Sequence, residues 1–144
     1  MKYQIYIFRH QKQEQFRNCV YKSELNRTRL LYENIKHLQI SRVFACCPSI
    51  HNKHILPLQT AATLCTFLGK NLELCSDARE LPKYITNNIL IVWHHGDILS
   101  ILENYGMLGH FEWSDDDYDG CLMINDYGWE YDHSFLTSSS CCWL

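Results

Sequence analysis

The sequence has no apolar run long enough to cross a membrane, no Cys-x-x-Cys pair and no excess of positive charge. The first absence argues against a transmembrane helix, which needs about 20 consecutive apolar residues. The second leaves a structural zinc site weakly supported, because such sites usually draw on closely spaced cysteines. The formal net charge of −3 gives no broad electrostatic basis for binding nucleic acid.

The amino terminus shows neither the apolar segment nor the small-residue cleavage site of a secretory signal. We therefore expect a cytoplasmic protein whose eight cysteines are free thiols, mostly buried, rather than disulfides. The 144 residues contain no internal repeat and no long linker. Residues 1–136 are predicted to form a single domain, and residues 137–144 a flexible tail.

What the sequence does contain is an alternation of strand and helix signals. Its order predicts an α/β fold, a three-layer sandwich with a mostly parallel central sheet flanked by helices. The predicted strands are residues 3–8, 42–46, 72–75 and 89–93, with one or two more in residues 121–124 and 129–136. The predicted helices are residues 26–38, 57–69 and 98–106.

Several of these elements have clear local signals. Pro57 suits the first turn of a helix, and Gly69 suits its end. Asp97 is predicted to cap the helix that follows it. Residues 89–93 are all apolar, which is typical of a central strand covered on both faces.

Two of the predicted strands end in histidine. The first is followed by Arg9 and His10, and the long apolar strand is followed by His94, His95 and Gly96. The carboxyl ends of parallel strands meet at one edge of a sheet, where α/β folds bind their ligands. We therefore expect these side chains to lie near one another and to form the functional site.

An acidic run occupies residues 114–119 and holds much of the negative charge. A site for a hard metal ion would usually interleave its ligands with spacers and a glycine turn, and Gly120 is the one hint of this. We predict a solvated loop.

The motifs taken in order resemble those of the histidine phosphatase superfamily, which includes the phosphoglycerate mutases. That family has an Arg-His pair after its first strand, a strand with a Ser-Pro-like turn, a helix starting Arg-x-x-Gln-Thr-Ala, a Leu-x-Glu motif and an apolar strand ending His-Gly. The matching stretches here are "YIFRHQ", "VFACCPS", "LPLQTAATLCTFLG", "LELCSDARELP" and "ILIVWHHGD". The resemblance covers roughly residues 3–105.

The resemblance implies a phosphoglycerate mutase-like fold and a phosphatase that hydrolyses a phosphomonoester through a phosphohistidine on His10. Arg9 would hold phosphoryl oxygens, and His95 would donate a hydrogen bond to one of them. Glu80 would protonate the leaving oxygen and then activate water. Neither a metal nor another cofactor is expected.

Four positions depart from the family pattern, of which Gln13 and Phe16 replace a threonine and an asparagine often found just after the pair. Gln11 stands where glycine usually follows the Arg-His pair, and Leu56 stands where a second phosphate-binding arginine is usual. One interpretation is compensation by nearby Lys53 and His54, which would then bind phosphate. The other is a catalytically impaired pseudophosphatase that acts as a phosphate- or phosphoprotein-binding module.

The segment between Glu80 and the strand at residue 89 is short, which predicts an open pocket. We therefore expect a phosphorylated small molecule or a phosphoprotein as partner. A metal site using His94, His95 and cysteines is a weaker third interpretation, because adjacent residues of a strand face opposite sides. The final residues "CCWL" fit a prenylation pattern on Cys141, without which no membrane attachment is expected.

Overall fold

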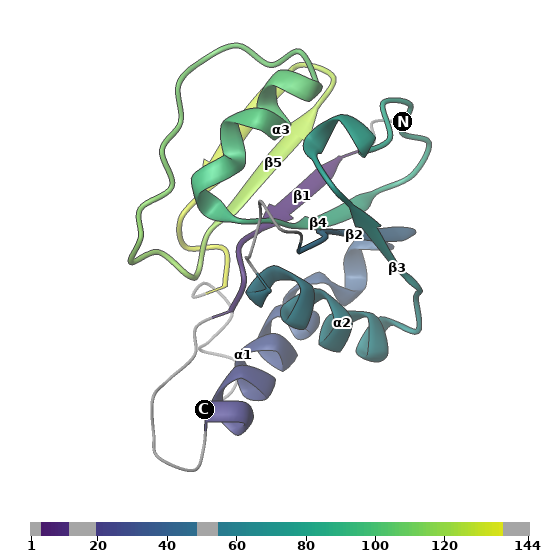
Figure 1. The fold of residues 1–144 in the computed structure, drawn as a ribbon, viewed down its shortest axis with the longest axis vertical. Helices are drawn as coiled ribbons and strands as arrows, with labels where there is room; N and C mark the ends of the chain where they lie inside the picture. Colours follow the sequence, from purple (N-terminus) through teal and green to yellow (C-terminus); the bar gives the residue numbers. More distant parts are fainter. Residues whose placement is uncertain (1–3, 12–19, 49–54, 137–144) are drawn as a thin grey trace.

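The computed structural model describes residues 4–11, 20–48 and 55–136. In chain order the strands are β1 Ile5–Phe8, β2 Arg42–Cys46, β3 Leu72–Cys75, β4 Ile89–Val92, β5 Cys121–Asn125 and β6 Gly128–Asp132 (Figure 1). The helices are α1 Val20–Ile35, α2 Leu56–Leu68 and α3 Ile98–Asn104, with short 3₁₀ turns η1 Lys36–Leu38, η2 Ala78–Glu80 and η3 His95–Asp97. The predicted tail lies outside the described residues.

The six strands form one sheet in the order β3-β2-β4-β1-β5-β6. Strands β3, β2, β4 and β1 are mutually parallel, whereas β5 runs antiparallel to β1 and β6 antiparallel to β5. The prediction of an α/β fold is confirmed, and the sheet is mixed, with four parallel strands followed by an antiparallel pair at one side. The two residues between β5 and β6 are too short for a crossover, so these strands form a hairpin.

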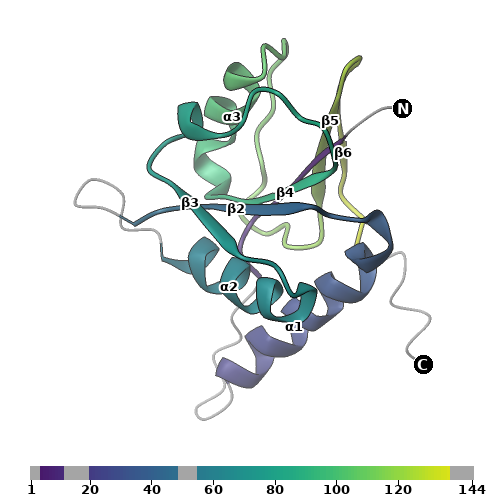
Figure 2. The same cartoon turned by 90° about the vertical axis from the view of Figure 1, so that its right-hand side faces the viewer.

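Helices cover both faces of the sheet (Figure 2). Side chains alternate between the faces along β1, so that Ile5 and Ile7 pack with the core on the α3 side. Tyr6 and Phe8 pack instead with the core on the α1 and α2 side. Strand β4 is divided in the same way, which explains why both strands are apolar at every position.

The local signals for α2 are confirmed at both ends. Pro57 lies in its first turn. Gly69 ends the helix with a φ of 67°, a left-handed conformation that glycine adopts without strain, and its N–H donates to the carbonyl of Cys65. Helix α1 begins earlier than predicted, at Val20, and the chain then continues into η1. Beyond β6 the chain turns, so the strand predicted for residues 129–136 ends at Asp132.

The predicted cap at α3 is wrong in its detail. Asp97 precedes the helix, but its carboxylate accepts no backbone N–H there. It accepts a hydrogen bond from Nε1 of Trp93 at 3.0 Å and another from the hydroxyl of Ser100 at 2.5 Å. The carboxylate therefore joins the end of β4 to the first turn of α3.

None of the described helices is both long and apolar enough to cross a membrane.

Candidate functional site

Parallel pairing of β1 and β4 brings the two histidine-bearing strand ends to one edge of the sheet. Phe8 is paired with Val92 at the last position of the ladder, and the N–H of Trp93 donates to the carbonyl of Phe8 at 2.9 Å. Arg9-His10 and His94-His95 therefore leave the sheet side by side. The expected convergence of these four residues is present in the structure.

Arg9 is almost completely buried, with 3 % of its surface exposed. Its NH1 group donates to backbone carbonyls of Ser114 at 3.2 Å, Asp115 at 2.8 Å and Asp117 at 3.4 Å. The guanidinium also stacks on Tyr118, with 4.0 Å between its carbon and the ring centre. Burial lowers the pKa of Arg9, and the neighbouring acidic groups oppose that shift, so the group stays charged at neutral pH.

His10 is half-buried next to Arg9. Its Nδ1 lies 3.1 Å from the carbonyl oxygen of Gln11, which can only accept a hydrogen bond. Nδ1 therefore carries a proton, and in the neutral ring the lone pair lies on Nε2. In this tautomer Nε2 is the nitrogen that can act as a nucleophile. The Tyr118 ring meets the imidazole nearly edge-on, with 5.6 Å between the ring centres.

His95 opens η3, directly after β4. Its Nε2 lies 2.7 Å from Oδ1 of Asp115, while its Nδ1 is buried and has no hydrogen-bond partner. The His94 ring packs against it at 5.0 Å. A Cβ atom at Gly96 would come within 2.8 Å of Nε2 of His94, so a larger residue at this position would require the His94 ring to move.

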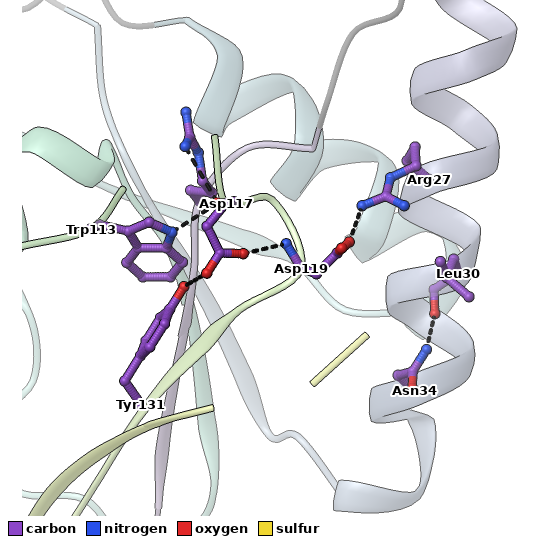
Figure 3. Close-up of polar contacts among 8 residues, drawn as sticks. Arg27, Leu30, Asn34, Trp113, Asp117, Asp119 and Tyr131 are labelled. Atoms are coloured by element: carbon purple, nitrogen blue, oxygen red, sulfur yellow. Dashed lines mark hydrogen bonds and ion pairs between the residues drawn. The ribbon is translucent and has the colours of Figure 1, made fainter. Parts of the chain in front are cut away.

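The predicted solvated loop is wrong in part. Asp115 and Asp116 are exposed, but Asp117 is partly buried and accepts hydrogen bonds from three other residues (Figure 3). Its carboxylate accepts hydrogen bonds from the Tyr131 hydroxyl and, at 3.0 Å, from the N–H of Asp119, and its carbonyl accepts one from Nε1 of Trp113 at 2.9 Å. These contacts fix the acidic run over the edge of the sheet.

Asp119 continues this anchoring towards α1. Its carboxylate lies 2.5 Å from a guanidinium nitrogen of Arg27 (Figure 3). Gly120 follows, and a Cβ there would collide with the hydroxyl of Tyr131. The glycine next to the acidic run therefore permits close packing against β6, and no metal-binding turn is needed to account for it.

Glu80 lies in η2 and is exposed. Its carboxylate accepts a hydrogen bond from the N–H of Ser76, four residues earlier. No described contact joins Glu80 to His10 or His95. Leu56 is the first residue of α2, and the predicted phosphate ligands Lys53 and His54 lie outside the described residues.

A polar hollow of about 510 Å³ lies between η2 and α3. Asp97, two residues beyond His95, forms part of its wall. Its charged and amide side chains come from Asp77, Arg79, Lys83, Asp97, Glu103 and Asn104. The hollow shares Asp97 with η3, but neither His95 nor His10 is among the residues that line it.

Metal binding is not supported by the described part of the chain, where no three His, Cys, Asp or Glu side chains gather around a common point. Of the five cysteines there, Cys47 is half-buried and the other four are buried: Cys46, Cys65, Cys75 and Cys121. This agrees with the prediction of buried thiols. Cys19, Cys141 and Cys142 lie outside the described residues, so the prenylation pattern stays a prediction.

The sequence matches no family model, and no curated protein matches it significantly.

The sequence did not lead us to expect Asp115 and Tyr118 as neighbours of the two histidines. An aromatic residue inside the acidic run was the available signal, because a fully solvated loop has no need of one.

Proposed function

We propose that this protein is a phosphatase that hydrolyses a phosphomonoester through a phosphohistidine on His10. The observation that carries the proposal is the parallel pairing of β1 with β4, because it brings Arg9-His10 and His95 to one edge. The contact of Nδ1 of His10 with the carbonyl of Gln11 supports it, since the neutral ring then has its lone pair on Nε2. The order of elements along the chain also supports a phosphoglycerate mutase-like, three-layer arrangement.

The proposed reaction has two steps. Nε2 of His10 attacks phosphorus, the bond from phosphorus to the leaving oxygen breaks, and Glu80 gives that oxygen a proton. Water then attacks the phosphohistidine, Glu80 takes a proton from the water, and phosphate leaves with Nε2 restored. Arg9 and His95 balance the phosphoryl charge, which is the largest demand in phosphoryl transfer.

Three features limit the rate of this reaction. Leu56 supplies no charge at the start of α2. One guanidinium nitrogen of Arg9 already donates to backbone carbonyls, and the carboxylate of Glu80 is bonded to a backbone N–H. Removing one preorganised charge from such a site costs roughly a hundredfold in rate. We therefore propose a slow enzyme.

The same features support a second candidate function, a phosphate- or phosphoprotein-binding module without turnover. Leu56 is the observation that favours it, because leucine cannot compensate phosphoryl charge. In either case the segment between Glu80 and β4 is short, which favours an open pocket that a large ligand can reach. A phosphorylated small molecule or a phosphoprotein fits that requirement.

The test is hydrolysis of an aryl phosphate, combined with trapping of acid-labile phosphate on the protein. The variants are His10→Ala, Leu56→Arg and, as a matched control, His110→Ala, whose side chain is 74 % exposed. The proposal expects activity that His10→Ala abolishes and His110→Ala leaves unchanged. An inactive wild type that binds phosphate, with activity appearing in Leu56→Arg, supports the binding module. Activity that does not depend on His10 refutes both functions.

A further inference from the structure

Residues 114–118, here called the acidic strap, lie across the candidate site. The strap contacts Arg9 through backbone carbonyls, His10 through the ring of Tyr118, and His95 through the carboxylate of Asp115. The closest of these contacts involves an anionic group. This matters because the proposed ligand of the same site is also an anion.

The contact with His95 uses the one N–H that the ring has available. Nδ1 is buried without a hydrogen-bond partner, so a proton on Nδ1 would be left unsatisfied at considerable cost. A lone pair on Nε2 would in turn face a carboxylate oxygen at 2.7 Å. The proton therefore lies on Nε2, and this N–H donates a hydrogen bond to the carboxylate of Asp115.

A phosphoryl oxygen bound by His95 needs that same N–H. One short hydrogen bond cannot serve a carboxylate and a phosphoryl oxygen together, and the two anions also repel each other at this distance. We propose that Asp115 is an internal competitor that occupies the phosphate-binding N–H of His95 until a ligand displaces it. This inference rests on the proposed function and adds a means of regulating the same site.

Displacement requires only a local movement. The side chain of Asp115 is 91 % exposed, so its carboxylate can turn into solvent by rotating about its own bonds. The rest of the strap stays anchored, because Asp117 is held by Trp113 and Tyr131. Arg9 keeps its backbone carbonyl partners during this rotation. The competitor therefore acts without unfolding the loop.

The test is binding of inorganic phosphate, measured by titration calorimetry in about 0.15 M salt, where distant charges are largely screened. The variants are Asp115→Ala and Asp115→Asn. The matched control is Asp116→Asn, which removes the same charge from the adjacent exposed residue. Circular dichroism verifies that each variant is folded.

We expect Asp115→Ala to bind phosphate about tenfold more tightly than wild type, as when a competing closed state is removed. Asp115→Asn should follow in the same direction, and Asp116→Asn should change affinity by less than about twofold. Equal affinity in wild type and both Asp115 variants, or weaker binding in them, overturns the competitor while leaving the phosphate site standing. No phosphate binding in any variant overturns the site itself and the competitor with it.

Discussion

The guanidinium of Arg9 stacks on the ring of Tyr118 at 4.0 Å. The same ring meets His10 nearly edge-on, so one aromatic side chain lies against both residues of the pair that follows β1. Tyr118 thereby links the acidic strap to the end of the strand. The pair on β1 is held in place from a part of the chain that lies far away in sequence.

The ring of Tyr118 should contribute to stability. We expect Tyr118→Ala to lower the free energy of unfolding by about 1–2 kcal/mol, because it removes a partly buried cation–π contact and the contact with His10. Tyr118→Phe keeps the ring and should cost less than about 0.5 kcal/mol. Urea unfolding followed by tryptophan fluorescence measures both. Equal losses in the two variants would assign the effect to the hydroxyl instead.

Thr60 should be important for the segment after His10. Its hydroxyl accepts the buried N–H of Gln11 at 3.0 Å. We expect Thr60→Val to cost about 1–3 kcal/mol, because that N–H is then buried without a partner. Thr60→Ser keeps the acceptor and should recover most of the loss. Thermal unfolding monitored by circular dichroism distinguishes the two variants, and similar values for both would contradict the prediction.

Gln11 offers a prediction of the opposite sign. Its side chain is 1 % exposed, and neither amide atom has a hydrogen-bond partner. Replacing both unsatisfied atoms with apolar atoms of similar shape is neutral or favourable. We expect Gln11→Met to raise the free energy of unfolding by about 1 kcal/mol, measured by urea unfolding. A clear loss of stability would mean that the amide has a bound partner in solution.

Asp117 is expected to be the most sensitive carboxylate of the acidic run. Asp117→Ala should lower the free energy of unfolding by about 2–3 kcal/mol, because it leaves the Tyr131 hydroxyl and the N–H of Asp119 without an acceptor. The exposed Asp116 is the matched control, and Asp116→Ala should cost less than about 0.5 kcal/mol. Chemical denaturation of both variants provides the comparison.

Asp117→Ala should also change the titration of the Tyr131 hydroxyl. Burial and the hydrogen bond to the Asp117 carboxylate raise the pKa of Tyr131. Without that carboxylate the pKa should fall, although burial keeps it above the ordinary value. Ultraviolet difference spectra in alkali, compared with those of Tyr131→Phe, isolate this tyrosine. An unchanged titration would show that the carboxylate contact is absent in solution.

The buried thiols predict a loss of stability in alkali. Burial raises the pKa of Cys65 and of Cys75 from 9.0 to about 11. In the unfolded chain these thiols ionise near 9.0, so between that pH and about 11 the unfolded state binds fewer protons than the folded state. Stability should therefore fall as the pH rises through this window. Cys65→Ala with Cys75→Ala should flatten the pH dependence of the urea midpoint, and an unaltered slope would contradict the assignment.

The elements that could be predicted from sequence are those with strong local signals. The apolar run at residues 89–93 predicted a central strand, which the structure has at Ile89–Val92, and Pro57 and Gly69 predicted the ends of a helix. Such signals act over a few residues, so they do not depend on the rest of the fold. The meeting of the two strand ends followed from the predicted parallel sheet, because parallel strands bring their carboxyl ends together.

The contacts that could not be predicted are those between distant segments. Arg9 and Asp115 are separated by 106 positions, and nothing near either residue indicates that they meet. Asp97 illustrates a second reason. Its carboxylate could have capped α3 but accepts hydrogen bonds from the side chains of Trp93 and Ser100 instead. The choice between these donors and the backbone depends on how the side chains pack, which the local sequence does not show.

The strand order has a consequence for synthesis of the chain. β1 lies between β4 and β5, and both of these neighbours are translated long after it. An emerging chain therefore exposes an entirely apolar strand, Ile5–Phe8, with both edges open until β4 has left the ribosome and one edge open until β5 has followed. Such a segment is prone to pair with other nascent chains. We expect the yield of native protein to depend on chaperones that shield this strand during translation.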